Sequence, residues 1–568
     1  MSQQAAVPVA QGNPLWAITQ ALFYTAFAGV SGSLSQLTLA PVFGSIPAAA
    51  QHDQILRWAL LLAFLAKDTI MQYLPPNPKR YLPVVAFYVP MAQYFFSRDS
   101  NRIGASAGPA ALESLTYFPL VLLSAICITD SLDVFPAFKR TPAIQVSVGV
   151  VVWLGLSYSA PFITPYLASL PLLTDLPISA EYLSRVNLQL ATAAIAAPLA
   201  PSLMQFLALP AIYHATNYNV HFMSDYHTSL LNATLRPRGW TLIDRQESNT
   251  GYISVLESMQ DQYRVLRCDH SLLGGEWLPS PERIADGITN NEPIYAVFNI
   301  LEAVRLVEIG GVKDRKTDSE KKALVIGAGV GTSPKALLAH GIDTTIVELD
   351  PIVHEFAKKY FGLPTNHTAV LENALTWVQS GALAQGAYTR YDYIIHDVFT
   401  GGAEPLDLFT DSFLADLRSL LTPEGVIAIN YAGDVGTIPA KQVLNTINNV
   451  FEGRCRLFRD LPAEGENGDF SNMVVFCINP AAQRAFEGFS FRKPVDADYL
   501  GSVSRQNYLL PRSDLELRFP TQEEMVSEKV QTITKSTANS FRKEQLKSAE
   551  RHWKIMREVV PPFVWENW

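Results

Sequence analysis

The chain is 568 residues long, 48% hydrophobic and 17% charged, and it carries a formal net charge of -9. Globular proteins average about 25% charged residues, so this chain is poor in charge, and its length is enough for roughly two to four domains. An acidic chain without a large basic region has little means of displacing counterions from phosphates, which excludes nucleic acid as an expected partner.

The N-terminal third has the composition of a membrane protein. Residues 1–52 contain no Asp, Glu, Lys or Arg, and the first apolar run exceeds the about 20 residues that a helix needs to cross a bilayer. It also lacks the initial basic cluster of a cleaved signal peptide. We predict a membrane domain over 1–215 with about six hydrophobic spans, at 15–44, 55–74, 82–97, 114–129, 143–169 and 187–213.

A large soluble helical domain is the alternative for this region. The runs at 15–44, 143–169 and 187–213 argue against it, because a helix without a polar face must be buried or lie in lipid. Lysines and arginines occur in successive connections, so the positive-inside rule gives no orientation.

Residues 216–290 are predicted to form a small subdomain of β-strands. Three short segments separated by polar turns, at 239–246, 251–258 and 262–270, are typical of an antiparallel sheet. The sequence LLGGEW that follows them predicts a glycine-marked turn.

Residues 291–490 show helices alternating with strands, after a helix predicted at 291–310 from its apolar spacing. This alternation predicts a doubly wound, seven-stranded Rossmann-like sheet, which binds ligands at the carboxyl ends of its strands. The strand candidates are 323–329, 344–350, 368–374, 391–399, 425–431, 456–461 and 472–479. The functional loops are then expected at 327–332, 348–350, 372–374 and 397–404.

A glycine turn follows the first of these strands. Gly327, Gly329 and Gly331 spell GxGxG, and glycine lets the backbone turn sharply and approach a ligand, while the next helix N-terminus favours negative charge. A threonine occupies the third glycine position of the dinucleotide fingerprint. Glu348 and Asp350 follow about 20 residues later, where carboxylates can bind ribose hydroxyls. We expect nucleoside binding here; a packing turn beside a solvated Glu348 is the alternative.

Two polar residues end the next strands. Asn373 could hydrogen-bond an adenine edge or form a turn, and without pyrophosphate-type spacing a sulfonium nucleoside such as S-adenosylmethionine fits better than NAD. Asp397 ends the fourth strand, where a carboxylate can accept a proton from an attacking amine, hold a cationic substrate or cap the next element. By strand alternation, His396 points to the other face and is expected to be packed.

The chain ends in an extension, 491–568, with a basic helix at 535–560. This helix is expected to pack on the catalytic domain, with contact to anionic lipid as the alternative. The cysteines lack CxxC spacing, which predicts neither a disulfide framework nor a metal site and is compatible with a reducing compartment. They are Cys127, Cys268, Cys455 and Cys477.

Several of these motifs occur together, in this order, in one known family. GAGVGTSPKALLAH, VELDP, YDYIIHDVF and DLFTDSFLADLRSLLTPEGVIAIN, preceded by GYISVLES and YRVLRCDHSLLGG, resemble the spermidine synthase (aminopropyltransferase) family over roughly 240–480. DVFTG is similar to its divergent branch, in which such a domain follows a polytopic membrane segment. The resemblance implies that Glu348 binds the ribose and that Asn373 replaces the adenine-binding Asp. It also implies that Asp397 is the catalytic carboxylate, with Tyr295 as a second catalytic candidate that lines the pocket.

The departures from the family pattern bear on the reaction. The aminopropyltransferases have an Asp in the glycine loop that holds the amine of decarboxylated S-adenosylmethionine, and here this residue is Val330. The second Asp of their DSSDP-like segment is missing from DVFTGG, and the Glu of their YxE pattern is Val297. A polyamine needs carboxylates to replace its water, since unpaired charges in a cleft cost several kcal/mol each.

We therefore expect a membrane-anchored transferase that uses S-adenosylmethionine or its decarboxylated form, with methyl transfer narrowly favoured. Aminopropyl transfer to make a polyamine is the first alternative, and a transporter or sensor with a non-catalytic nucleoside-binding domain is the second. The expected partners are a small-molecule acceptor, either an amine or a lipophilic compound, and membrane lipid. The expected location is a multi-pass membrane protein with a cytosolic catalytic domain; the oligomeric state is left open.

Overall fold

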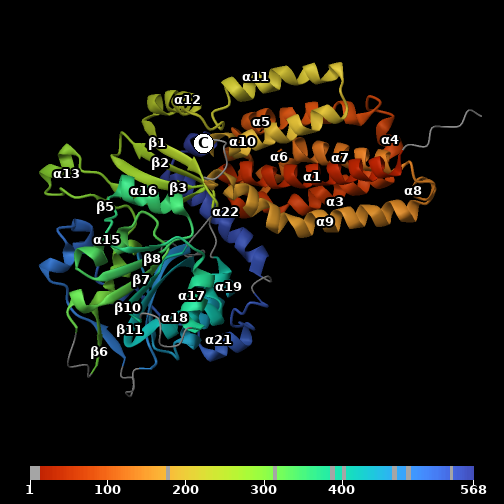
Figure 1. The fold of residues 1–568 in the computed structure, drawn as a ribbon. Coiled ribbons are helices and arrows are strands. Elements are labelled where there is room, and N and C mark those ends of the chain that lie inside the picture. The colour runs from red at the N-terminus through yellow and green to blue at the C-terminus, as the bar shows by residue number, and fades with distance from the viewer. Residues whose placement is uncertain are drawn as a thin grey trace, which may run out of the picture. The chain divides into compact units, whose positions relative to one another are not determined.

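The computed structural model describes residues 13–173, 180–310, 316–383, 390–398, 405–462, 470–481, 488–537 and 541–568. The chain divides into two compact units. The helical unit comprises residues 1–233 and 560–568, and the transferase unit comprises residues 234–559 (Figure 1).

The helical unit is built around α1, which packs against α7, α9 and α10. Its three helices long and apolar enough to cross a membrane are Pro14–Phe43, Ser100–Leu132 and Pro142–Leu172, among the described residues. The helices are α1 (Pro14–Phe43), α2 (Ser45–Ala50), α3 (His52–Leu65), α4 (Lys67–Met71), α5 (Leu82–Ser97), α6 (Ser100–Leu115), α7 (Tyr117–Leu132), α8 (Pro136–Arg140), α9 (Pro142–Ser169), α10 (Arg185–Ala196), α11 (Leu209–Asn217), α12 (Asp225–Leu235) and, near the C-terminus, α23 (Pro562–Glu566).

The helical unit exposes apolar side chains and buries paired polar ones. On α9, Val151 is 67% exposed, Tyr158 75% and Phe162 77%. Inside, the Glu113 carboxylate lies 2.7 Å from Nδ1 of His52, and Lys67 donates to Asp133 at 2.6 Å. Glu113 and Lys67 are therefore paired, which is the arrangement that a low-dielectric surrounding requires.

The transferase unit begins with an antiparallel sheet in the order β1-β2-β3-β4-β5. Its strands are β1 (Trp240–Glu247), β2 (Tyr252–Ser258), β3 (Tyr263–Cys268), β4 (Ser271–Trp277) and β5 (Glu292–Pro293). The turn predicted at LLGGEW is wrong, because these residues form β4. Its glycines have a packing reason instead: a Cβ on Gly275 would lie 2.6 Å from the carbonyl oxygen of Arg264.

The larger sheet has eight strands in the order β15-β12-β13-β11-β10-β7-β8-β9. Strands β11, β10, β7, β8 and β9 run parallel, whereas β12, β13 and β15 are antiparallel additions. The bounds are β7 (Lys322–Ile326), β8 (Asp343–Val347), β9 (Thr368–Val370), β10 (Tyr391–His396), β11 (Leu421–Asp434), β12 (Cys455–Arg459), β13 (Phe470–Ile478) and β15 (Glu516–Leu517). The predicted doubly wound sheet is thus present, with the two-residue β15 beyond the seven expected strands.

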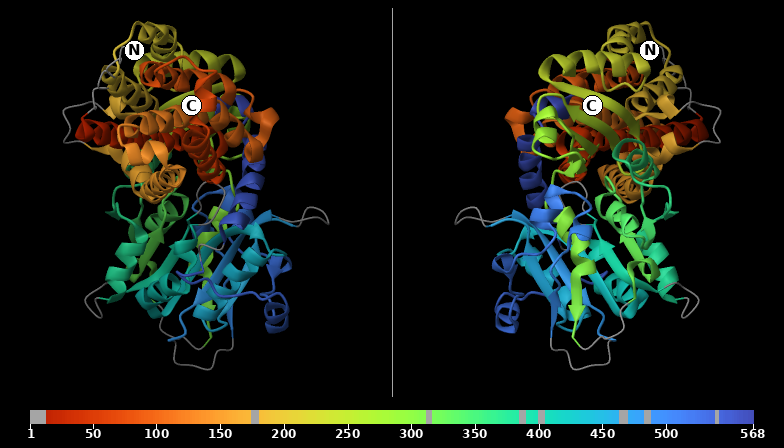
Figure 2. Two further views of the ribbon diagram at one scale, coloured as in Figure 1. Left: turned by 90° about the vertical axis from the view of Figure 1, so that its right-hand side faces the viewer. Right: turned by 90° about the vertical axis from the view of Figure 1, so that its left-hand side faces the viewer.

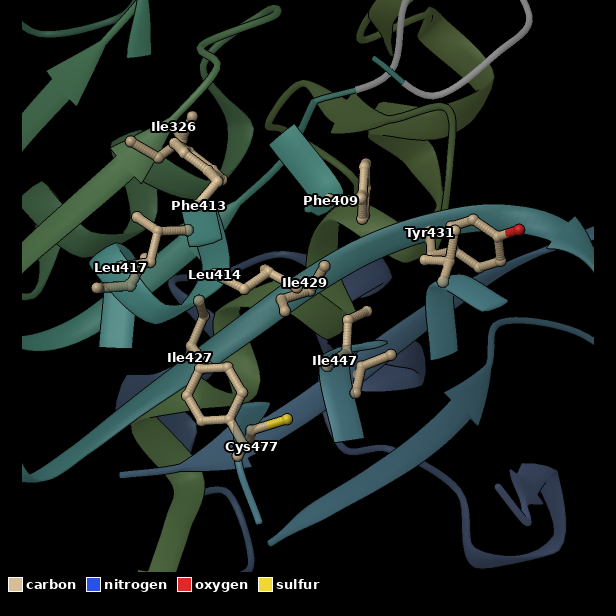
Figure 3. Packing of buried hydrophobic residues seen from close by; sticks show 14 of the residues in the cluster. Ile326, Phe409, Phe413, Leu414, Leu417, Ile427, Ile429, Tyr431, Ile447 and Cys477 are labelled. Atoms are coloured by element: carbon tan, nitrogen blue, oxygen red, sulfur yellow. The ribbon is translucent and has the colours of Figure 1, made fainter. Parts of the chain in front are cut away.

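Helices cover both faces of this sheet (Figure 2). One buried cluster joins the sheet to α17 (Ala374–Leu383), α18 (Asp411–Leu420) and α19 (Ile438–Val450), and Figure 3 shows its centre around Phe413 and Ile427. On the other face lie α14 (Val297–Leu301), α15 (Thr332–Ala339) and α16 (Pro351–Phe361). The sheet edge between these two layers carries the loops that build the site.

Two further expectations about the transferase unit are wrong. The single helix predicted at 291–310 is divided into β5, α14, a 3-10 helix at Glu302–Leu306 and β6 (Val307–Ile309), which pairs with β14 (Phe489–Phe491). Cys455 and Cys477 form a disulfide. These cysteines are 22 residues apart and become direct partners only through the antiparallel pairing of β12 with β13, which no local spacing reveals.

The remaining described helices follow the sheet. They are α13 (Pro281–Ala285), α20 (Val503–Tyr508), α21 (Gln522–Ser527) and α22 (Arg542–Val559). The expected basic helix corresponds to α22, where Trp553 is buried and its ring stacks on that of His270 in the same unit at 5.6 Å. This agrees with the expected packing of that helix on the catalytic domain. Beyond it, Trp568 is buried in the helical unit and its ring stacks on His221 at 4.5 Å.

Candidate functional site

The glycine loop leaves β7 in a conformation that requires glycine. Gly327 has a φ of 86°, and a Cβ there would lie only 2.1 Å from the carbonyl oxygen of Asp397. Gly329 has a φ of 51°, and its Cβ would lie 2.6 Å from the carbonyl oxygen of Leu273. Gly331, with a φ of 80°, precedes α15 as its N-cap. Positive φ costs L-residues free energy, so both the turn and its close approach to the Asp397 strand end depend on these glycines.

Val330 faces the small β-subdomain. Its side chain is 2% exposed, and a Cβ on Gly274 of β4 would lie 2.8 Å from its Cγ2. The loop position that carries an Asp in aminopropyltransferases therefore holds an apolar side chain. This side chain packs against the backbone of Gly274. A carboxylate here would lose its water without a described cation to replace it.

Glu348 follows β8 and is held by two backbone N–H groups. The N–H of Ala328, in the glycine loop, donates to Oε2 at 2.7 Å, and the N–H of Asp350 donates to Oε1 at 3.0 Å. Burial raises the pKa of Glu348 to about 7, against the lowering effect of these two donors. The carboxylate is thus fixed beside the glycine loop, where a nucleoside ribose is expected.

Asp350 is occupied by local structure. Its Oδ1 accepts from the hydroxyl of Ser248 at 2.7 Å and from the N–H of Ile352 at 2.8 Å, and its Oδ2 accepts from the hydroxyl of Thr250. It is 1% exposed and caps α16. These hydrogen bonds join the β-subdomain to α16. The sequence pattern predicted a ribose contact for Asp350 and did not reveal this structural role.

Asn373 is exposed and lies beyond the end of β9, directly before α17. Its Oδ1 accepts from the N–H of Leu375 at 2.9 Å, and its carboxamide nitrogen makes no hydrogen bond among the described residues. An amide nitrogen can donate to a ring nitrogen of adenine. In this conformation the side chain of Asn373 can form the turn through its oxygen and still donate to an adenine through its nitrogen.

Asp397 ends β10 and touches a residue that the sequence analysis did not single out. The Nδ2 of Asn430, in the neighbouring strand β11, donates to Oδ1 of Asp397 at 2.8 Å. Burial raises the pKa of Asp397 to about 6, partly offset by this amide. The other end of the carboxamide, Oδ1 of Asn430, is buried with no hydrogen-bond partner among the described residues. In the sequence, Asn430 stands out only as a polar residue within the otherwise apolar strand GVIAINY.

Tyr295 lines the same face of the sheet. Its ring packs edge-on against Phe298 at 5.9 Å, and its hydroxyl is buried with no partner in the described part of the chain. Burial raises its pKa above the usual value of tyrosine, so the hydroxyl is protonated and can donate. Residues 399–404 of the expected loop at 397–404 lie outside the described residues. His396, as expected, points to the other face, where its ring lies 4.9 Å from that of Phe409.

The strand order brings these groups to one edge of the sheet. Strand β7, which carries the glycine loop, lies between β8 and β10, so Glu348 and Asp397 flank the loop on its two sides. Unpartnered buried groups such as the Asn430 carbonyl and the Tyr295 hydroxyl are costly unless something binds them. These hydrogen-bonding groups therefore fit a sulfonium nucleoside together with a substrate whose nitrogen accepts the transferred group.

A cavity of about 480 Å³ opens at the same edge, beyond the end of β11. Its wall includes Tyr431 and Asp434 from β11, Gln442 from α19, and Arg551 from α22. Arg551 lies 3.4 Å from the carboxylate of Asp434. Through Arg551 and Asp434 the cavity wall offers both signs of charge.

The chain is similar to several known proteins. Residues 305–451 match the model of the spermine/spermidine synthase domain. An N-terminal histidine N-methyltransferase from Emericella nidulans is 39% identical over 543 residues, which cover 94% of each chain. A polyamine aminopropyltransferase from Vibrio vulnificus is 32% identical over 114 residues, 19% of this chain and 37% of that protein. A solved structure of a probable spermidine synthase from Corynebacterium glutamicum is 15% identical and covers 51% of this chain and 95% of that chain, with a TM-score of 0.37.

Proposed function

This chain belongs to the spermidine-synthase-like family, and we propose that it is an S-adenosylmethionine-dependent methyltransferase that acts on the N-terminal histidine of a polypeptide. It is a transferase whose cofactor is S-adenosylmethionine or the decarboxylated form. The choice of methyl transfer is supported by the relative that matches 94% of the chain, which is an N-terminal histidine N-methyltransferase. The choice of acceptor rests on that same relative.

The structural observation that carries methyl transfer is the environment of Val330. Intact S-adenosylmethionine bears a carboxylate that a loop Asp would repel, whereas the decarboxylated cofactor bears only an amine that such an Asp would attract. Val330 is buried against β4, so the loop offers neither that attraction nor that repulsion. Losing the repulsion favours the intact cofactor, because like charges in a cleft of low dielectric are costly.

The chemistry requires position and a proton acceptor. The cofactor supplies a methyl group on a sulfonium centre, which is already activated for in-line displacement. Glu348 fixes the ribose, and Asp397 accepts the proton that the acceptor nitrogen loses as its new N–C bond forms. Oδ1 of Asn430 can accept a hydrogen bond from an N–H of the same acceptor, since it is buried and unpartnered among the described residues. Two neighbouring hydrogen-bond acceptors, on Asp397 and Asn430, suit the N–H groups of an imidazole or an amine.

We also propose that the helical unit inserts into a membrane. The support is the exposed apolar surface of α9, together with the three helices of sufficient length and apolar character. A water-soluble bundle would need to cover Tyr158, Phe162 and their neighbours, because contiguous apolar patches of this kind mark interaction with lipid or protein. Fractionation tests this directly: the protein should stay in the membrane pellet after alkaline carbonate washing and be released by detergent.

Aminopropyl transfer remains the second candidate, supported by the synthase domain match and the Vibrio relative. Its difficulty is the scarcity of carboxylates for a polyamine. Among the described residues, Asp397 is the carboxylate that accepts a hydrogen bond from Asn430.

The deciding experiment uses the full-length protein in detergent with a synthetic peptide that begins with histidine. Intact cofactor should yield S-adenosylhomocysteine and a singly methylated peptide, and decarboxylated cofactor should yield no methylthioadenosine from putrescine. A matched peptide with alanine placed before the histidine should not be methylated. Methylthioadenosine formation would instead establish the second candidate, and equal methylation of the two peptides would remove the requirement for an N-terminal position. Fragmentation of the product assigns the methyl group to the ring or to the α-amine.

A further inference from the structure

The loop between α16 and β9 carries a sequence that the transferase reaction does not use. Asn366, His367 and Thr368 form the pattern N-x-[ST] with a residue other than proline in the middle, which is the acceptor signal for N-linked glycans. Asn366 and Thr368 are both exposed, and among the described residues no hydrogen bond involves the Asn366 carboxamide. His367 holds the loop in place, because its ring nitrogens lie 2.7 Å from the carbonyl oxygen of Pro364 and 2.9 Å from His354.

A glycan at this position would stay clear of the active site. Thr368 begins β9 and pairs with Thr345 of β8, three residues before Glu348. Asn366 precedes Thr368 and therefore lies toward the amino ends of the parallel strands, away from the carboxyl ends that carry Glu348 and Asp397. Strand β9 is also the last strand of its sheet, and an open strand edge benefits from a bulky, solubilising neighbour.

A second observation points to the compartment in which such glycans are attached. The transferase unit contains the Cys455–Cys477 disulfide between β12 and β13. Disulfides form and persist in the lumen of the endoplasmic reticulum and outside the cell, and are rare in the cytosol. Strands β9, β12 and β13 belong to one sheet of one compact unit, so Asn366 and the disulfide must lie in the same compartment.

We propose that Asn366 is an N-glycosylation site and that the transferase unit faces the lumen of the secretory pathway. This is the opposite side from the cytosolic placement expected from cysteine spacing. The sequence holds a second acceptor pattern at Asn232, Ala233 and Thr234, but Asn232 lies inside α12 and is only partly exposed. Asn232 is therefore the internal comparison.

The test is enzymatic removal of glycans from the full-length protein expressed in yeast membranes. The wild-type band should move to a lower apparent mass after treatment with PNGase F. Asn366→Gln and Thr368→Ala should already run at the lower position, whereas Thr368→Ser, which keeps the acceptor pattern, should behave as the wild type. Asn232→Gln should leave the shift in place. All four variants should retain transferase activity, because none of these residues lies in the site.

Two results of the glycan experiment would overturn the proposal. If PNGase F does not move the wild-type band, the protein carries no N-linked glycan. If the shift persists in Asn366→Gln but is lost in Asn232→Gln, the glycan is on Asn232 and not on Asn366. The compartment is checked separately by counting thiols with maleimide in denatured, unreduced protein. Two thiols, those of the free Cys127 and Cys268, support the lumenal placement, whereas four would overturn it. Neither measurement depends on the identity of the transferred group, so the failure of one proposal is distinguishable from the failure of the other.

Discussion

Glu348 and Asp397 are two buried carboxylates on either side of one glycine loop, and they differ in how their oxygens are occupied. Both have raised pKa values, and in both burial is the leading cause. Glu348 accepts from two backbone N–H groups. Asp397 accepts from a single side chain, that of Asn430, among the described residues.

This difference separates two roles that a raised pKa alone cannot distinguish. Two backbone donors fix Glu348 in one position, which suits a group that must present acceptor oxygens to a ribose. Asp397 retains an oxygen that no described donor uses, which suits a group that must take up a proton. Burial raises the pKa of both carboxylates, and their hydrogen bonds distinguish their two roles.

The largest expected effect is that of Asp397→Asn. The substitution keeps the shape and can keep the contact with Asn430, but it removes the proton acceptor, so the single-turnover rate should fall by ~100- to 10,000-fold. The dissociation constant for S-adenosylmethionine, measured by calorimetry, should stay within a few-fold of the wild type. A variant that keeps a near wild-type rate would show that Asp397 only positions the acceptor or the loop.

Glu348→Gln should produce the complementary pattern. A hydrogen bond to a charged group contributes about 1.5–3 kcal/mol, so the dissociation constant for the cofactor should rise by ~10- to 100-fold. At saturating cofactor the rate of methyl transfer should change little, because the proton acceptor is intact. A large loss of rate at saturation, with unchanged affinity, would reverse the two roles.

The pH dependence should divide along the same line. Since Glu348 titrates near pH 7 and Asp397 near pH 6, cofactor affinity should increase as pH rises through about 7, whereas kcat should increase through about 6. Below its pKa each group is neutral, so each property should fall as pH decreases, and the loss of cofactor affinity should level off at the ~10- to 100-fold expected for Glu348→Gln. In Glu348→Gln the affinity profile should become flat while the kcat profile keeps its acidic limb. Coincident profiles that both survive in Glu348→Gln would contradict the assignment.

Sequence patterns predicted the parallel strands and the positions of their functional loops. Alternating strands and helices predict a parallel sheet, and the sheet brings the carboxyl ends of its strands together, so the sequence alone groups Gly327, Glu348 and Asp397. The same local reasoning could not find Asn430, because one polar residue in an apolar strand is equally consistent with a strand interior.

Long-range contacts account for the other differences. Asp350 resembles a ribose ligand by position, yet its oxygens are taken by Ser248 and Thr250, about a hundred residues earlier. The glycines of LLGGEW read as a turn, but they lie in β4 where Val330 and the Arg264 carbonyl approach the backbone. The disulfide depends on the pairing of β12 with β13. Each of these partners becomes a neighbour only after folding.

The smallest expected effect, and the finest test of the comparison, is that of Asn430→Leu. Leucine fills a similar volume but donates no hydrogen bond to Asp397, so the charged form of that carboxylate loses its described stabilising donor and its pKa should rise further. The acidic limb of the kcat profile should therefore move to higher pH, while the rate well above the limb stays within a few-fold of the wild type. KM for the acceptor should also increase, because Oδ1 of Asn430 is no longer there to accept an N–H. Asp397→Asn serves as the reference, since it should show no such limb at all. An unchanged limb in Asn430→Leu would mean that the 2.8 Å contact does not tune Asp397, and the distinction between the two carboxylates would then rest on Glu348 alone.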